Sequence, residues 1–161
     1  MKATNRFVPF TALLTLACAG PEPTPDTAER QRSVAEVGAT VMPFDLENST
    51  HVFTKNTSGG LQKVMSDSNN PDQISLIRQH LSQEATKFSQ GDFHDPEMIH
   101  GGDMAGLHEL VTGFEQVSFE YSEIASGAQI LYTSKEPSLV TAIHSWFDAQ
   151  LEDHGDHARP H

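Results

Sequence analysis

Two stretches of the chain carry apolar residues at helical spacing. The first covers about residues 72–89, begins after Pro71 and ends before Gly91. The second follows Pro137 and ends before Gly155. Apolar residues recur in both at intervals of three or four positions, and glycine and proline stand where helices stop and start. The pattern therefore predicts two amphipathic helices, each with one face buried in a core.

Apolar and polar residues alternate in the stretches that precede each predicted helix. Alternation is clear over residues 117–121 and again over residues 128–132, on either side of Gly127. A weaker version of the pattern lies on either side of Gly59 and Gly60. Alternating segments joined by a glycine turn are typical of β-hairpins. We therefore predict one hairpin before each helix.

The chain thus repeats one order of elements, β-β-α-β-β-α. Gly59-Gly60-Leu61 in the first half matches Ser126-Gly127-Ala128 in the second. Two hairpins can pair into one sheet, and two helices that each have a single apolar stripe can cover one of its faces. We therefore predict an α+β fold with a four-stranded antiparallel sheet, two helices on one face, and a pseudo-two-fold repeat.

The ends of the chain differ in composition from this core. Residues 1–17 combine positive charges with a short uncharged stretch that ends in small residues, which predicts a signal peptide. Residues 18–33 are rich in proline and polar residues and predict a flexible linker. A single α+β domain is predicted for residues 34–153. Residues 154–161 predict a histidine-rich polar tail, either frayed or metal-binding.

Cys18 is the only cysteine of the chain, and the signal peptide predicts export into an oxidising compartment. The residues Leu14-Thr15-Leu16-Ala17-Cys18 resemble a lipobox, in which the cysteine is lipidated and becomes the new N-terminus. We therefore predict a cell-envelope lipoprotein held at the membrane by a lipid on Cys18. Ala19 stands where an aspartate commonly retains lipoproteins at the inner membrane, which favours the outer membrane, facing the periplasm. The alternative is ordinary cleavage near Ala17 or Ala19 and release of the protein.

Charge and motifs narrow the function classes. The formal net charge of −12 argues against a nucleic-acid partner, because phosphate backbones are bound by basic surfaces. A lipidated lone cysteine leaves neither a thiolate metal site nor a disulfide scaffold. The chain contains no nucleophile elbow, no H-E-x-x-H, no phosphate-binding glycine loop and no haem-attachment motif. No motif therefore names a reaction.

Histidine is frequent, with nine residues in the chain. The densest group of candidate metal ligands is His94, Met98, His100, Met104 and His108. Imidazole and thioether without thiolate form a ligand set that copper accepts, particularly Cu(I). The alternative is a surface connector whose apolar residues, such as Met98 and Met104, close the edge of the core.

Three more histidines lie within predicted elements: His51 in a strand and His80 and His144 on the helices. Each helix also has a carboxylate one turn after its histidine, Glu84 after His80 and Asp148 after His144. Such pairs are typical of metal ligands or of imidazoles oriented by a carboxylate. The alternative is a half-buried histidine at the edge of a helix.

Five sequence blocks together resemble an uncharacterised family of short exported bacterial proteins. The blocks are MPFDLENSTHVF, GGLQKV, IRQHL, GDFHDPEMIHGGDMAGL and AIHSWFDAQLEDHG, and they cover nearly all of the mature chain. The resemblance implies five shared histidines: His51, His80, His100, His144 and His154. Some members carry an aspartate carbamoyltransferase label. We reject that label here, because the chain lacks the Ser-Thr-Arg-Thr and His-Pro segments and the longer two-domain scaffold of that enzyme.

Three hypotheses for the function follow. The leading one is that the protein binds a transition-metal ion, with copper favoured over zinc or iron, or a metal-centred cofactor such as haem. The five shared histidines would hold it, with Met98 or Met104, for storage, delivery or sensing. The second is an interaction module for another envelope protein, with structural histidines. The third is a small hydrolase or isomerase that uses a pair such as His144 and Asp148. The leading hypothesis predicts that the five imidazoles meet in the folded domain.

Overall fold

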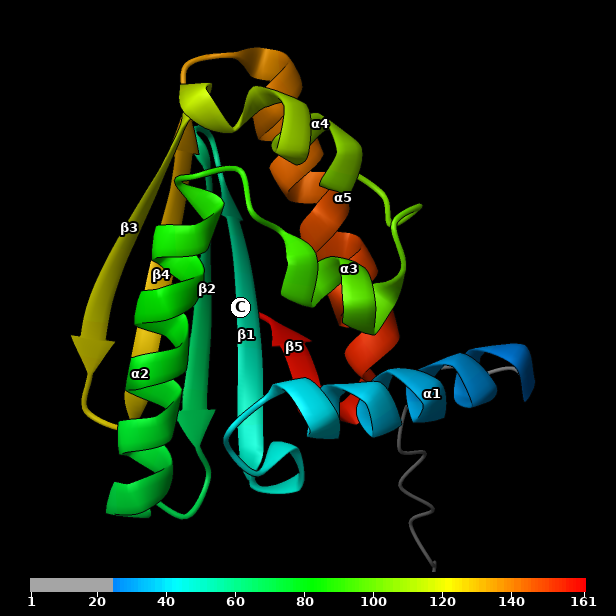
Figure 1. The fold of residues 1–161 in the computed structure, drawn as a ribbon, viewed down its shortest axis with the longest axis vertical. Coiled ribbons are helices and arrows are strands. Elements are labelled where there is room, and N and C mark those ends of the chain that lie inside the picture. Colours follow the sequence, from blue (N-terminus) through cyan, green and yellow to red (C-terminus); the bar gives the residue numbers. More distant parts are fainter. Residues whose placement is uncertain (1–24) are drawn as a thin grey trace, which may run out of the picture.

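The structure, a computed structural model, describes residues 25–161, so the predicted export signal, Cys18 and the first part of the predicted linker lie outside the described residues. A twisted sheet forms one layer, and helices cover one of its faces (Figure 1). The helices are α1 (Pro25–Val41), α2 (Pro71–Phe88), α3 (His94–His100), α4 (Leu107–Gly113) and α5 (Pro137–His154). The strands are β1 (Ser49–Asn56), β2 (Gly59–Ser66), β3 (Val117–Ile124), β4 (Gly127–Ser134) and β5 (Ala158–Pro160).

The sheet joins two hairpins through their inner strands, in the order β3-β4-β2-β1-β5. Neighbouring strands are antiparallel, except that β5 pairs with β1 in parallel. In the register His51 is opposite Val64, and Val64 is opposite Ala128. Directly opposite residues point to the same face of a sheet, so His51 shares the helix-covered face with the core. The predicted α+β class and the pairing of two hairpins are confirmed.

The number of elements in our prediction was wrong. The sheet has five strands instead of four, and the described residues form five α-helices instead of two. Residues 25–33, placed in the flexible linker, are the first half of α1. Residues 154–161, placed in a polar tail, comprise the last residue of α5, a 3₁₀ turn (Gly155–His157) and strand β5. The connector between the two halves forms α3 and α4.

The two predicted helices are present and their ends have local causes. Asn70 caps α2 by accepting hydrogen bonds from the backbone N–H groups of Asp72 and Gln73, and Pro71 occupies the first turn. Pro137 likewise begins α5, which ends at His154, directly before its C-cap Gly155. Gly155 has φ +51°, a left-handed conformation that favours glycine. Periodicity together with these start and stop residues explains why both helices could be predicted.

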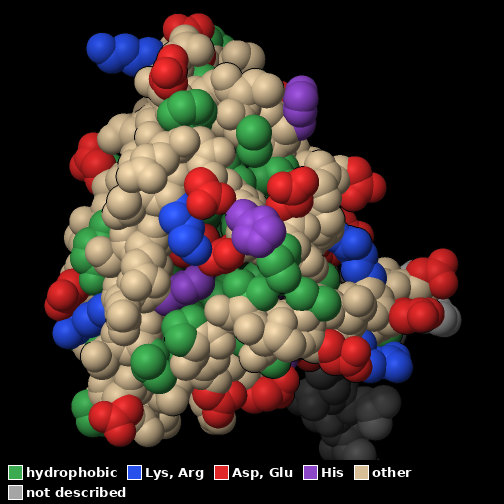
Figure 2. Space-filling view, in the orientation of Figure 1, with side chains coloured by type: hydrophobic (Ala, Val, Ile, Leu, Met, Phe, Trp, Pro, Cys, Tyr) green, Lys and Arg blue, Asp and Glu red, His purple; other side chains and the backbone are tan. Residues whose placement is uncertain are grey.

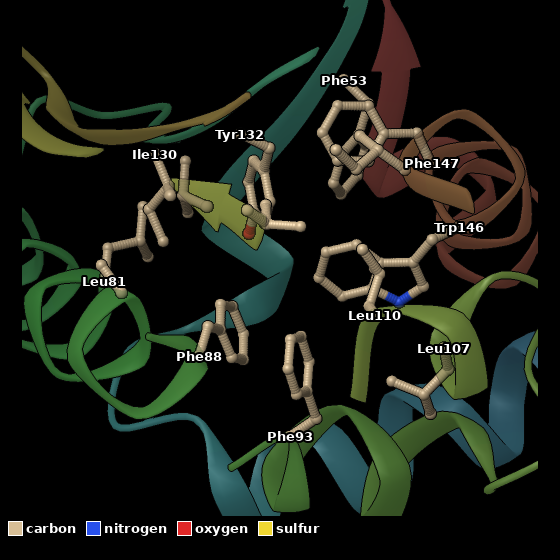
Figure 3. Packing of buried hydrophobic residues seen from close by; sticks show 14 of the residues in the cluster. Phe53, Leu81, Phe88, Phe93, Leu107, Leu110, Ile130, Tyr132, Trp146 and Phe147 are labelled. Atoms are coloured by element: carbon tan, nitrogen blue, oxygen red, sulfur yellow. The ribbon is translucent and has the colours of Figure 1, made fainter. Parts of the chain in front are cut away.

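An aromatic core holds α2 and α5 against the sheet (Figure 3). Tyr132 of β4 packs edge-on against Trp146 and Phe147 of α5, with ring centroids 5.5 and 5.4 Å away. Phe88 of α2 packs edge-on against Trp146, at 5.9 Å. Such edge-to-face pairs stabilise beyond the area they bury, by about 1 kcal/mol each. The core thereby fixes α2 and α5 on one face of the sheet. Within residues 25–161 the structure contains no helix that is long and apolar enough to span a membrane.

Candidate functional site

A small, partly open cavity of about 40 Å³ lies where the sheet meets α2, α3 and α5. Four histidines line it, and each comes from a different element: His51 from β1, His80 from α2, His100 from α3 and His154 from α5. We call it the histidine cavity. Its volume is larger than the space one water molecule needs. Its other polar lining residues are Gln62, Glu84 and Gln150.

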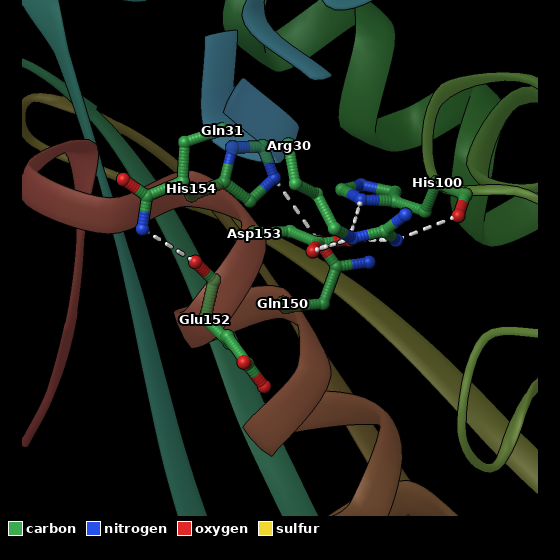
Figure 4. A network of polar contacts seen from close by, with 7 residues as sticks. All are labelled: Arg30, Gln31, His100, Gln150, Glu152, Asp153 and His154. Atoms are coloured by element: carbon green, nitrogen blue, oxygen red, sulfur yellow. Dashed lines mark hydrogen bonds and ion pairs between the residues drawn. The ribbon is translucent and has the colours of Figure 1, made fainter. Parts of the chain in front are cut away.

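His100 is oriented by a carboxylate of α5 (Figure 4). Its Nδ1 lies 2.8 Å from Oδ2 of Asp153, and both side chains are almost fully buried. Nδ1–H therefore donates to Asp153, which leaves the other ring nitrogen, Nε2, unprotonated in the neutral imidazole. Arg30 of α1 holds the same carboxylate, from Nε to Oδ1 at 2.5 Å and from Nη2 to Oδ2 at 2.7 Å. It also donates to the backbone oxygen of His100 at 2.8 Å.

His154 contacts two of the other cavity histidines. Its ring stacks on that of His51, with centroids 4.9 Å apart and planes inclined by 9°. The ring of His100 meets it edge-on, at 5.1 Å and 73°. Nε2 of His154 lies 3.0 Å from Oε1 of Gln150, one turn earlier on α5. His154 thus contacts two imidazoles that are remote from it in sequence.

His51 has a buried nitrogen without a partner. The residue is only 3 % exposed, and its Nδ1 makes no hydrogen bond with any described residue. Phenylalanine rings neighbour it, Phe44 at 6.2 Å and Phe53 at 6.4 Å between centroids. A buried polar atom without a partner is costly. It therefore suggests a ligand or water at this position.

His80 and Glu84 lie on α2 and border the cavity. Glu84 accepts a hydrogen bond from Nζ of Lys87 at 3.0 Å, and the same ammonium bonds Asp95 of α3 at 2.6 Å. The ring of His80 packs edge-on against Phe44, with centroids 5.7 Å apart. An ion-pair cluster of Glu84, Lys87 and Asp95 thus joins α2 to α3 beside the cavity.

Burial favours the neutral form of His51, His80 and His154. It lowers the pKa of His51 and of His80 to about 4, since an imidazolium loses its hydration there. Burial also lowers the pKa of His154 well below its ordinary value, and it raises the pKa of Glu84 to about 7. Although burial raises the pKa of Asp153, the hydrogen bonds from His100 and Arg30 outweigh it and lower that pKa. At neutral pH the cavity therefore offers imidazole lone pairs.

Four of the five histidines that we predicted to meet line the histidine cavity, and their binding of an ion stays a prediction. The fifth, His144, lies elsewhere on α5, where its Nε2–H is shared between the backbone oxygens of Gly59 at 2.8 Å and Asn56 at 3.0 Å. Asp148 forms an ion pair with Lys55. The pair that we predicted between His144 and Asp148 is therefore not formed, and His144 ties the β1–β2 turn to α5.

The dense group in the connector does not form a site. His94 and His108 are exposed, Met98 is 50 % exposed, and Met104 is buried in the hydrophobic core. Only His100 of this group lines the cavity. The other side chains of the group point to the surface, except that Met104, between α3 and α4, is buried in the core, as the connector alternative expected.

The histidine cavity is not preorganised as a coordination sphere. Within residues 25–161 no three histidine, cysteine, aspartate or glutamate side chains are arranged to hold a metal ion. The stacked pair explains this, because lone pairs lie in the plane of an imidazole ring and two parallel rings cannot aim them at one point. For His51 and His154 to bind the same ion, one of the two rings has to rotate.

The roles of two residues were not predicted from the sequence. Asp153 was considered only as a residue that could grip an ion together with His154, and its contact with His100 was not foreseen. Arg30 was assigned to the linker. Only the adjacency of Asp153 to a histidine could have indicated its role, whereas nothing local marks Arg30.

Comparison of the chain with protein families, with curated proteins and with solved structures found no match. The function therefore has to be inferred from the chemistry of the cavity.

Proposed function

We propose that this protein binds a transition-metal ion in the histidine cavity. The observation that carries the proposal is that four imidazoles from four elements line one small cavity. A buried histidine usually satisfies its ring nitrogens with neighbouring groups. Four at one cavity, one of them with an unpartnered Nδ1, are more than a core requires.

The protonation states support this proposal. Metal ions bind the neutral imidazole, and protons compete with them. The lowered pKa values of His51, His80 and His154 remove that competition at neutral pH. The hydrogen bond from His100 to Asp153 is the carboxylate–histidine arrangement that fixes the tautomer of metal-binding histidines.

Binding would require a local change. His51 or His154 would turn out of the stack, and the freed lone pairs would meet at the ion together with Nε2 of His100. Exposed side chains reorient in nanoseconds, and buried ones more slowly. We therefore propose an exchangeable ion for storage, delivery or sensing, instead of a permanent structural one.

The lining residues suggest which ion it is. Imidazoles and one carboxylate suit Cu(II), Zn(II), Ni(II) and Fe(II), and Cu(II) has the highest affinity in that series. Neither Met98 nor Met104 lines the cavity, whereas Met42 does, so a thioether that suits Cu(I) is still present beside the imidazoles. The volume of about 40 Å³ leaves no room for a porphyrin. We therefore favour copper, with zinc next, over haem.

The single tryptophan provides the test. Trp146 lines the cavity, so its fluorescence should be quenched when Cu(II) binds there. The protein would be purified without chelator or affinity tag, its metal content measured, and Cu(II) and Zn(II) titrated against a competing chelator. His100→Ala should weaken binding by about a hundredfold, and the surface variants His94→Ala and His108→Ala should not.

An affinity no tighter than that of an unfolded histidine-containing peptide would overturn the proposal. The hypothesis of an interaction module would then lead, with the uncovered face of the sheet as its surface. In that case, crosslinking in the envelope should capture a stable partner of the metal-free protein. Export, the lipid on Cys18 and the outer-membrane location belong to the same proposal. Labelling with a radioactive fatty acid tests the lipid, and Cys18→Ala should abolish that labelling.

A further inference from the structure

A second, larger pocket lies beneath helix α1. Its volume is about 300 Å³, and it is enclosed by α1, by the segment before β1 and by the end of α5 with the turn that follows. Ala35 and Gln31 of α1 line it on one side, and Asp156 lines it on the other. We call it the outer pocket.

The outer pocket and the histidine cavity share two residues. His51 and His154 line both, and their rings are the stacked pair, 4.9 Å apart. This pair is therefore the partition between the small cavity and the larger pocket beside it. The ring rotation that would let His51 and His154 coordinate an ion would also open this partition.

The charge of the outer pocket suits a cation. Its lining includes the carboxylates of Glu47 and Asp156 against the guanidinium of Arg32, whereas the carboxylate of Asp153 is already paired with Arg30. Figure 2 shows both acidic and basic side chains over α1. At the other approach, between α2 and α3, the Lys87 ammonium is paired with two carboxylates, those of Glu84 and Asp95.

We propose that the outer pocket is the entrance of the histidine cavity, and that a divalent transition-metal ion passes from it to the cavity through the stacked pair of His51 and His154. Helix α1 forms the roof of this entrance and is fastened there by Arg30 on Asp153 and by Gln31 on the backbone oxygen of Glu152. The inference rests on the proposed function, because it assumes that the cavity binds an ion.

Filling the outer pocket with a larger side chain tests whether the ion passes through this pocket or only binds in it. Ala35→Phe would fill the outer pocket, whereas Ala39→Phe on the exposed side of the same helix is the matched control. Both keep Trp146 as the only tryptophan, so Cu(II) binding can be followed by stopped-flow fluorescence. Ala35→Phe should slow association and dissociation by the same factor, about tenfold, with an unchanged Kd. Ala39→Phe should change neither rate.

A second pair of variants covers the case in which Ala35→Phe does not fold. Glu47→Gln with Asp156→Asn removes two carboxylates of the outer pocket, and Glu109→Gln with Glu115→Gln removes two exposed ones near α4. The first pair should slow association about threefold to tenfold at low ionic strength, and the second should not.

The outcomes separate the two proposals. If the unaltered protein binds Cu(II) but neither the block nor the charge removal changes the rates more than its control does, the entrance lies elsewhere and this inference is wrong. If the unaltered protein binds no ion, the proposed function itself fails.

Discussion

Asp153 accepts a hydrogen bond from Nδ1 of His100 at 2.8 Å, and the side chains are 4 % and 2 % exposed. The contact links α5 to α3, and Arg30 adds α1 to the same carboxylate. A single buried acid thus sets the tautomer of His100 and joins three helices at the edge of the histidine cavity. The negative charge of Asp153 is balanced, because the guanidinium of Arg30 contacts its carboxylate.

Replacing this acid should therefore weaken the site. Asp153→Asn removes the charge that holds Nδ1–H, so that His100 can adopt the other tautomer, and Cu(II) affinity should fall about tenfold to a hundredfold. Fluorescence titration measures the affinity, and ¹⁵N NMR of the imidazole reports the tautomer. Asp148→Asn is the control, because Asp148 is exposed on the same helix and bonds only to Lys55. Equal affinities in both variants would show that Asp153 has no positioning role.

The metal-free protein should lose stability in acid. His51 and His80 have a pKa of about 4 in the folded protein and 6.5 in the unfolded chain. Between these values the unfolded chain binds protons that the folded chain does not, so the free energy of unfolding falls as the pH drops from about 6.5 to about 4. The full loss is about 3 kcal/mol per histidine. Urea denaturation at a series of pH values measures it.

Glu84 works in the opposite direction and supplies a control. Its pKa of about 7 in the folded protein is above its ordinary value, so its contribution to stability is present at low pH and is lost as the pH rises through about 7. Glu84→Gln should therefore make the acid-induced loss of stability steeper, and His80→Asn should make it shallower. The reverse order would contradict the assignment of these groups.

The sequence could predict elements with local signals. The α2 and α5 helices have regular apolar spacing and clear end residues, and the hairpins have alternation around glycine. α1 lacks such a signal, since Val34 is its only residue among the buried hydrophobic side chains of the described chain. Its position depends on Arg30 and Gln31, whose partners lie at the other end of the chain.

The candidate site was predictable only in part, for a related reason. Residue type and resemblance selected His51, His80, His100 and His154 together with His144, but neither says where a side chain points. His144 and His154 both lie on α5, ten positions apart, but His144 faces the β1–β2 turn instead of the cavity. Its partners are backbone oxygens, which sequence cannot reveal.

His144 should therefore contribute to stability and not to binding. His144→Ala removes the N–H that serves the backbone oxygens of Asn56 and Gly59, so the free energy of unfolding should fall by about 1 kcal/mol. The Kd for Cu(II) should not change. His108→Ala, an exposed histidine on α4, should affect neither quantity. A tenfold weaker Kd in His144→Ala would return this residue to the site.

The C-terminal strand should matter more than its length suggests. Ala158, Arg159 and Pro160 pair in parallel with His51, Val52 and Phe53, so β5 covers the edge of the strand that carries a cavity histidine. Unpaired strand edges expose backbone groups to solvent and to other chains.

Ending the chain after His157 should accordingly lower the free energy of unfolding by about 1 to 3 kcal/mol. Hydrogen exchange should become faster in β1 but stay unchanged in β3 and β4, because the far hairpin keeps its partners. Removal of His161 alone is the control, since that residue follows β5 and is exposed. Unchanged protection of β1 in the longer truncation would mean that β5 contributes nothing to holding His51 in place.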